Sequence, residues 1–171
     1  GGGYVDKLLW DNELITTYFQ RNSQLLATYK GNNSGTDLES ELRSHTDYDY
    51  SRTSTISDIA MPATPGINKR YYYFNQSHSA TYNQVFRVGK NGELGINAAY
   101  LNDRDERSNQ SVTTTLLPDG SKNVVDESFN GILHRNIANG NITYMQNTER
   151  NYIKEQLKFD WLSTDGYSNI Y

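Results

Sequence analysis

Acidic side chains are the first residues that could do chemistry, and they gather in three clusters within polar stretches. The clusters are Asp37, Glu39 and Glu41; Asp47 and Asp49; and Asp103, Asp105 and Glu106. Carboxylates at such spacing can bind Ca²⁺ or flank a glycosidic bond. Neither of the last two clusters continues into the Gly and Glu positions of an EF-hand loop, and arginines alternate with the third. The pattern favours a solvated, salt-bridged surface and predicts no metal site and no catalytic residue.

The histidines do not form a site either. His45, His78 and His134 are the three histidines, and none lies two or four positions from another. This spacing does not match a zinc site, and the chain has no cysteine for a thiolate site or a disulfide. A Ser-His-Asp triad stays open, because neighbours in space are not visible in the sequence, but nothing specific supports one. We expect no enzymatic activity and no cofactor.

Tyrosines in and beside a long polar stretch are better candidates for ligand binding. An aromatic ring stacks on the apolar C–H face of a sugar, while Asn, Asp and Arg bond the sugar hydroxyls. Packing within the loops would explain the same tyrosines equally well. The predicted substrate-binding residues are Tyr48, Tyr50, Tyr71, Tyr73, Asp103 and Arg104.

The composition limits the elements that can position these residues. The 171-residue chain has 35% hydrophobic and 21% charged residues, 14 tyrosines and a formal charge of −4. It is too apolar for a disordered tail, and it has no apolar run long enough for a transmembrane helix. A mildly acidic chain with no basic block argues against a nucleic-acid binder. Abundant Tyr and Thr with few helix formers predict an all-β protein.

Period-2 alternation predicts an antiparallel up-and-down meander of about six long strands. The clearest strand carries Asn75, Ser77, Ser79, Thr81 and Asn83 on one face. The predicted strands cover residues 9–19, 24–30, 71–88, 93–101, 137–145 and 152–161. Two long loops, 31–69 and 102–130, alternate with three short turns. All short turns then lie at one end of the sheet and both loops at the other, which is typical of outer-membrane β-barrels.

Strand length and aromatic placement also indicate a membrane barrel. Residues 72–88 would extend roughly 55 Å, enough for a tilted strand to cross a bilayer. Aromatic residues fall into two bands, as two membrane interfaces select. Trp10, Tyr29, Tyr72, Tyr100 and Trp161 form the band beside the loops, and Tyr18, Phe19, Phe86, Tyr144 and Tyr152 form the band beside the turns. We therefore expect a section of a large outer-membrane β-barrel, with outer-membrane lipid around it.

Three stretches carry a resemblance to a known family: LLATYKGNNSGTD at 25–37, PGINKRYYYFNQSH at 65–78 and AYLNDR at 99–104. They resemble the barrel of TonB-dependent outer-membrane receptors of the Bacteroidetes type, and the likeness covers nearly the whole chain. The resemblance implies a barrel of about 22 strands closed by an N-terminal plug. It also implies import of a nutrient such as a glycan or a siderophore, powered by the TonB complex and helped by a surface lipoprotein.

The chain is expected to be a section of a longer protein, because it opens on three glycines with no initiator Met or signal peptide. No plug and no TonB-contacting segment are recognisable. The Asn75–Asn83 face would line the barrel interior, and both long loops would face outside. The alternative is a soluble secreted β-sheet module that binds carbohydrate, for which strands of about 5–6 residues in a sandwich are expected. A glycan-cleaving enzyme using two of Asp47, Asp49, Asp103 and Asp105 is a weaker third hypothesis.

Overall fold

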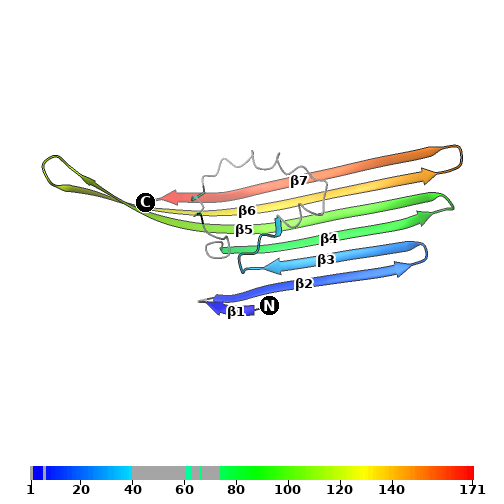
Figure 1. Cartoon of the computed structure of the whole chain (residues 1–171), viewed down its shortest axis with the longest axis horizontal. Helices are drawn as coiled ribbons and strands as arrows, with labels where there is room; N and C mark the ends of the chain where they lie inside the picture. The colour runs from blue at the N-terminus through cyan, green and yellow to red at the C-terminus, as the bar shows by residue number, and fades with distance from the viewer. Residues whose placement is uncertain (1, 6, 40–60, 63–65, 67–73) are drawn as a thin grey trace.

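Seven antiparallel strands form one sheet in the computed structural model, which describes residues 2–5, 7–39, 61–62, 66 and 74–171 (Figure 1). The strands lie side by side in chain order, and the sheet is open rather than closed into a barrel. Their bounds are β1 Gly2–Val5, β2 Lys7–Gln20, β3 Ser23–Asn32, β4 Phe74–Val88, β5 Gly92–Leu116, β6 Lys122–Asn147 and β7 Tyr152–Ile170. The six long strands β2–β7 confirm the predicted all-β, up-and-down meander.

Strand β1 is the one strand that alternation did not predict. It is four residues long and pairs with the start of β2, where Gly2 lies opposite Trp10. A strand this short carries too few residues for a period-2 pattern to stand out. Strands β2 and β3 lie close to their predicted bounds. Strand β4 begins at Phe74, and the three earlier residues assigned to it lie outside the described residues.

Three short turns lie together at one end of the sheet, called the turn end below (Figure 1). They join β2 to β3, β4 to β5 and β6 to β7. Gly89 adopts a φ of 65° in the second turn, a backbone conformation that glycine adopts without steric cost. In the third turn the Thr148 N–H donates to the Asn151 carbonyl at 2.8 Å. The opposite end, the loop end, carries the β3–β4 and β5–β6 connections.

The predicted loop 102–130 is wrong, because both strands continue through most of it. Strand β5 runs on to Leu116 and β6 begins at Lys122, with Thr114 paired to Val124. A tight turn closes this hairpin at Gly120, whose φ is 81°. Alternation of apolar and polar residues shows that one face of a strand is apolar, but it does not show whether the strand is paired. The alternation is lost in this hairpin because neither of its faces is consistently apolar.

The far part of this hairpin is a two-stranded ribbon, residues 107–127, that projects past the rest of the sheet (Figure 1). The last residue of β5 that pairs with β4 is Glu106. On the other side, the β6–β7 ladder starts at Phe129, with a further pair of backbone hydrogen bonds between Ser128 and Tyr171. The ribbon strands therefore pair only with each other among the described residues.

The small apolar core lies on one face of the sheet, beneath the start of the β3–β4 connection. Leu38 packs there against Ala99, Leu101 and Ile137, all of them buried, with Leu162 alongside. Residues 33–39, called the strap below, run from Asn33, which is bonded to the β2 backbone, across β4 to Leu38 over β5 and β6. Most of the predicted loop 31–69 lies outside the described residues.

No helix in the described part of the chain is long and apolar enough to cross a membrane.

Candidate functional site

Strand register divides the sheet into two chemically different faces. Residues paired across an antiparallel ladder point to the same side, and successive residues alternate. Leu14, Tyr29, Ala80, Tyr100, Ala138 and Trp161 form one continuous row across β2–β7. The parallel row one residue away consists of Glu13, Lys30, Ser79, Leu101, Ile137 and Leu162. We call the side of the first row the apolar face and the side of the second the polar face.

Three successive rows on the apolar face contain no charged residue and no histidine. Beyond the row just given they are Thr16, Ala27, Tyr82, Ala98, Gly140 and Phe159, then Tyr18, Leu25, Gln84, Ile96, Ile142 and Leu157. A fourth row adds Phe86, Leu94 and Tyr144 but ends in Glu155. Many of these side chains are exposed; Leu157, for example, is 68% exposed. An exposed apolar band of this size is typical of a surface that contacts another protein or a membrane.

Tyrosines at both margins of this band turn their hydroxyls away from its middle. At the loop-end margin, Tyr29 Oη lies 2.8 Å from His78 Nδ1, and Tyr100 Oη donates to Asn136 Oδ1 at 2.9 Å. His78 and Asn136 belong to the next row toward the loop end, which is polar. The apolar part of each ring therefore stays within the band while the hydroxyl leaves it.

The turn-end margin repeats this arrangement in the opposite direction. Tyr18 Oη donates to Gln20 Oε1 at 3.3 Å, and Tyr144 Oη donates to Gln146 Oε1 at 3.4 Å. In both strands the glutamine lies closer to the turn end than the tyrosine. Tyr82, inside the band, likewise donates to Gln84 on the turn-end side. Amphipathic rings oriented in this way match an apolar layer with a wet boundary on each side.

Most of the predicted aromatic bands lie on this face, with two exceptions. Trp10, Tyr29, Tyr100, Trp161, Tyr18, Phe86 and Tyr144 are on the apolar face, and Tyr72 lies outside the described residues. Phe19 and Tyr152 lie at the turn end, as predicted, but on the polar face, so they do not join the band on the apolar face. They were grouped by their distance along the strand, which does not distinguish the two faces.

A compact group of rings covers Gly31 at the loop-end margin. The Trp10 and His78 rings lie 5.5 Å apart at an angle of 37°, and the Tyr29 ring is 6.2 Å from His78. A Cβ on Gly31 would lie only 2.9 Å from Tyr29 Oη and 3.0 Å from the Trp10 ring. A larger residue would therefore force these rings to shift, and glycine lets them close over the backbone. His78 has the position in a strand that the sequence predicted.

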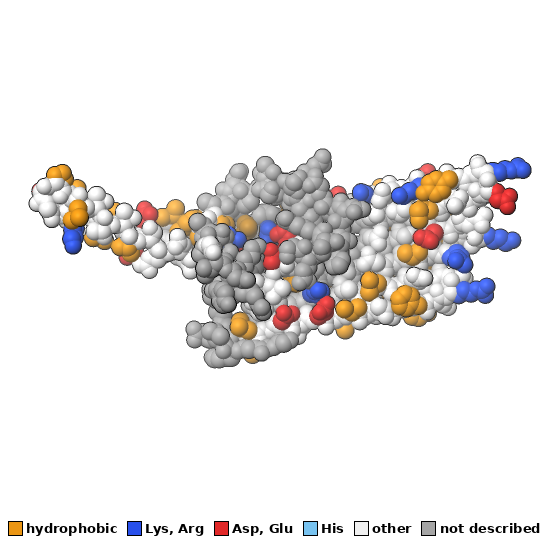
Figure 2. Space-filling model, viewed as in Figure 1, with side chains coloured by type: hydrophobic (Ala, Val, Ile, Leu, Met, Phe, Trp, Pro, Cys, Tyr) orange, Lys and Arg blue, Asp and Glu red, His pale blue; other side chains and the backbone are white. Residues whose placement is uncertain are grey.

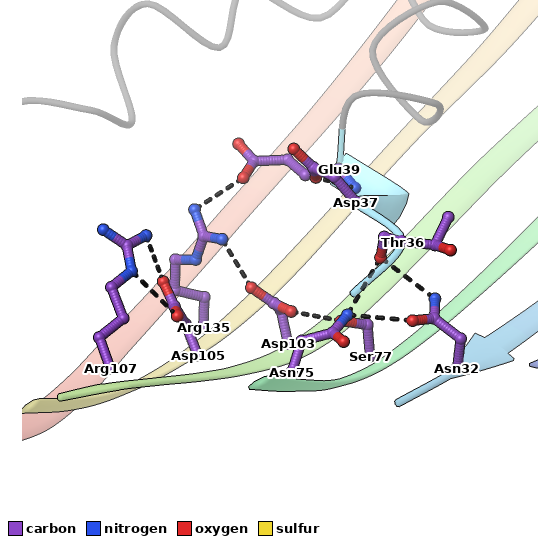
Figure 3. Close-up of polar contacts among 10 residues, drawn as sticks. All are labelled: Asn32, Thr36, Asp37, Glu39, Asn75, Ser77, Asp103, Asp105, Arg107 and Arg135. Atoms are coloured by element: carbon purple, nitrogen blue, oxygen red, sulfur yellow. Dashed lines mark hydrogen bonds and ion pairs between the residues drawn. The ribbon is translucent and has the colours of Figure 1, made fainter. Parts of the chain in front are cut away.

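The polar face carries hydrophilic side chains along β3–β6 and holds the strap at two places (Figure 3). The first is an amide cluster. The Gly35 N–H donates to Asn75 Oδ1 at 2.9 Å, while Asn75 Nδ2 donates to the Thr36 carbonyl at 3.0 Å. Asn32 Nδ2 donates to the same carbonyl at 3.2 Å. Gly35 adopts a φ of 82°, which lets the chain turn back over the sheet.

The second attachment is an ion-pair chain that starts at Glu39 (Figure 3). Arg135 donates from Nη1 to Glu39 Oε2 and from Nη2 to Asp103 Oδ2, each at 2.6 Å. Asp103 also accepts a 2.5 Å hydrogen bond from Ser77 Oγ. Arg135 therefore links the strap to strand β5 through one guanidinium, beside the apolar contact made by Leu38.

Asp105, two residues further along β5, forms its own pair with Arg107. Arg107 donates from Nε at 3.1 Å and from Nη2 at 2.5 Å, one bond to each carboxylate oxygen. Burial raises the pKa of the Asp105 carboxyl above its ordinary value, and the Arg107 contacts oppose this shift only in part. Asp103 nearby raises that pKa further and Arg135 lowers it. The two aspartates thus share one partly desolvated, charged layer.

The predicted substrate-binding residues do not form a common site among the described residues. Tyr48, Tyr50, Tyr71 and Tyr73 lie outside them. Asp103 is buried on the polar face, 4% exposed, with Ser77 and Arg135 bound to it. Arg104 points to the apolar face and pairs with Glu106 at 3.4 Å. Neighbours in a strand lie on opposite faces, so Asp103 and Arg104 cannot bind the same small ligand.

Sequence reasoning missed the roles of Glu39 and Arg135. Glu39 was placed in a solvated acidic cluster, yet its side chain is only 10% exposed and contacts a residue 96 positions away. The one local signal was the glycine and asparagine content of residues 32–35, which indicates a turn. In contrast, Asn75, Ser77 and Ser79 share the polar face with Thr81 and Asn83, as predicted.

In the part of the chain that the structure describes, this arrangement provides an exposed apolar surface and an anchored strap. In the described part of the chain, no three His, Asp or Glu side chains are grouped so that they could hold a metal ion. Comparison with known proteins gives no match: no protein-family model fits the chain, and no curated protein or solved structure matches it.

Proposed function

We propose that this sheet is a section of the wall of a bacterial outer-membrane β-barrel, with its apolar face toward lipid and its polar face toward the lumen. The supporting observation is the outward orientation of the tyrosine hydroxyls on both sides of an uncharged band. The first and fourth rows are six residues apart along a strand, about 20 Å, which a tilt of about 40° reduces to about 15 Å. That height is shorter than the apolar band of about 25 Å in such barrels, and the tyrosine rings at both margins lengthen it.

The transport role we propose is that of a TonB-dependent receptor importing a glycan, a siderophore or a similar nutrient. The sequence resemblance supports this choice. In such a barrel the strap would lie in the lumen, because residues 33–39 pack on the polar face. The ribbon would extend outside, because it lies at the loop end. The TonB complex and a surface lipoprotein would act through other parts of the protein.

The soluble carbohydrate-binding module is the less favoured alternative. It requires short strands in two layers, whereas β2–β7 contain 10–26 residues each and form a single sheet. A two-layer sandwich would also cover its apolar face with a second sheet. Among the described residues, nothing covers the apolar face.

Two neighbouring substitutions on β7 test the membrane placement. Leu157 and Gln156 are both exposed, but they lie on the apolar and the polar face respectively. Leu157→Arg in the full-length protein should lower the stability of the membrane-inserted form by about 1–2 kcal/mol, because the charge would enter the hydrocarbon layer in the row of Tyr18, nearer the margin than the midplane. Gln156→Arg should have a much smaller effect. Urea unfolding from phosphatidylcholine vesicles measures both.

Extraction of the wild-type protein from membranes is a second test of the membrane placement. The protein should remain in the membrane fraction after salt and carbonate washing and require detergent for extraction. Recovery of the full-length protein in the soluble fraction without detergent would contradict the proposal. Equal stabilities of the Leu157→Arg and Gln156→Arg variants would contradict it as well.

A further inference from the structure

Cationic side chains gather at the turn end of the sheet. Figure 2 shows Lys and Arg side chains at that end. The exposed cations there are Arg21, Arg87, Lys90, Arg150 and Lys154, so each short turn carries one or has one beside it. Three carboxylates, Glu93, Glu149 and Glu155, lie among them. Five cations and three carboxylates give this end a charge of +2 in a chain whose total is −4.

None of these five cations forms an ion pair within the described residues, unlike most of those nearer the loop end. The ion pairs of the described structure join Lys30 to Glu13, Arg104 to Glu106, Arg107 to Asp105, and Arg135 to Glu39 and Asp103. All of them lie on the loop-end side of the middle of the apolar band or beyond it. The turn-end guanidinium and ammonium groups are therefore available to an external anion.

We propose that the turn end binds anionic phospholipid headgroups through Arg21, Lys90 and Arg150, one in each short turn, in the leaflet that faces these turns. Arg87 and Lys154 lie on the polar face and would point to the lumen in this placement. This inference rests on the membrane placement proposed above. A soluble acidic partner would need only the charges. Here the charges directly follow an apolar band whose Tyr18 and Tyr144 hydroxyls point toward them. Along the sheet, the apolar surface is followed by amphipathic rings and then by cations. A lipid leaflet has the matching order of acyl chains, glycerol esters and phosphates.

The expected selectivity follows from the charge of the lipid phosphate. Phosphatidylglycerol carries one net negative charge, whereas phosphatidylcholine carries none. A basic residue near an anionic membrane surface contributes about 1 kcal/mol, which corresponds to about a fivefold preference. The Glu93, Glu149 and Glu155 carboxylates at the same end reduce this value. We therefore expect the whole turn end to prefer phosphatidylglycerol at least about threefold at low salt.

The test compares two variants that each lose two exposed cations. Lys90→Gln/Arg150→Gln removes charge at the turn end, and Lys122→Gln/Lys158→Gln removes the same charge elsewhere. The full-length protein in neutral detergent is offered an equal mixture of phosphatidylglycerol and phosphatidylcholine. Native mass spectrometry then gives the ratio of the two lipids retained. The wild type and the Lys122→Gln/Lys158→Gln variant should retain more phosphatidylglycerol, and Lys90→Gln/Arg150→Gln should lose most of that preference.

Two results would overturn the inference: equal retention of both lipids by the wild type, or an undiminished preference in Lys90→Gln/Arg150→Gln. A preference that persists at 0.5 M salt, about 4 Å in Debye length, would also contradict an electrostatic origin. Flotation of the wild type with pure phosphatidylcholine vesicles separates the two proposals. Failure to float overturns the membrane placement itself, whereas flotation without lipid preference overturns only the headgroup site.

Discussion

Arg135 connects two carboxylates that belong to different parts of the chain. Its side chain is 25% exposed, while those of Glu39 and Asp103 are 10% and 4% exposed. Breaking such a pair leaves carboxylates that water solvates poorly. The Arg135 guanidinium thus adds a charged link between the strap and β5 to the apolar contact made by Leu38.

We predict that Arg135→Met lowers the free energy of unfolding by about 2–4 kcal/mol, somewhat less than for a fully buried pair because the arginine is partly solvated. Arg104→Met is the matched control, since Arg104 forms an exposed pair with Glu106 and should cost less than about 1 kcal/mol. Urea denaturation of both variants measures the difference. Equal losses would show that the Arg135 contacts are no stronger than an ordinary surface pair.

Asp105 is predicted to make the fold less stable as it ionises. It lies beyond the apolar band, on the loop-end side of Tyr100. Because burial raises its pKa above 3.8, the folded state keeps the proton to a higher pH than the unfolded chain. The contribution of this group to the unfolding free energy therefore falls as pH rises from 3.8 through the raised pKa. Asp105→Asn should remove that slope in unfolding curves measured at successive pH values.

Asp119 provides the control with the opposite sign. Hydrogen bonds from the Ser121 hydroxyl and N–H lower the pKa of the Asp119 carboxyl. Its ionised form favours the fold, so its contribution is lost as pH falls from 3.8 through the lowered pKa. Asp119→Asn should therefore change the slope in the other direction. Changes of the same sign in the two variants would contradict the assignment for Asp105.

Among the elements, the ribbon differs most from the rest of the sheet. Its strands have no third partner in the described residues, and Val112, Leu116 and Val124 are 60%, 71% and 57% exposed. Isolated two-stranded hairpins are marginally stable in water. The ribbon should therefore open more often than the six-stranded part of the sheet around Leu101.

Hydrogen exchange can compare these two parts of the same strands. We predict that backbone amides of residues 109–127 exchange at least about tenfold faster than those of residues 94–102, which lie between two paired neighbours. Residues 138–144 of β6 serve as a second protected reference. Uniform protection along β5 would contradict this prediction and would mean that contacts beyond the pairing of its own two strands stabilise the ribbon.

The elements also show what alternation in the sequence can and cannot predict. The polar row Asn75–Asn83 of β4 was found because one face of that strand is apolar and the other is not. Residues 102–116 of β5 lack that contrast, so alternation predicts a loop where the structure has a long strand. The strap was not predictable, since Leu38 and Leu101 are far apart in sequence and only the fold brings them together. Likewise, closeness in sequence predicts one site for Asp103 and Arg104, but consecutive residues of a strand point to opposite faces.

As a whole molecule, the chain is a single layer with open edges. Strand β7 pairs only with β6 within the described residues, and β2 beyond Asp11 pairs only with β3. Such edges, together with the uncovered apolar face, favour association between copies in water.

We predict that the 171-residue chain, refolded in water, forms oligomers or larger aggregates, whereas detergent micelles keep it monomeric. Micelles cover the apolar face and so remove most of the driving force for association. Size-exclusion chromatography with light scattering distinguishes these states. A stable monomer in detergent-free buffer would mean that the chain covers this face by itself.

The opposed tyrosine hydroxyls have a consequence for membrane thickness. Within the proposed placement, Tyr29 and Tyr100 resist movement of the sheet in one direction along the bilayer normal, and Tyr18 and Tyr144 resist movement in the other. The protein would then fix its own immersion depth, and its short band would suit a thin bilayer such as the bacterial outer membrane. In a thicker membrane the lipids would have to compress around it, so the sheet would favour membranes of matching thickness.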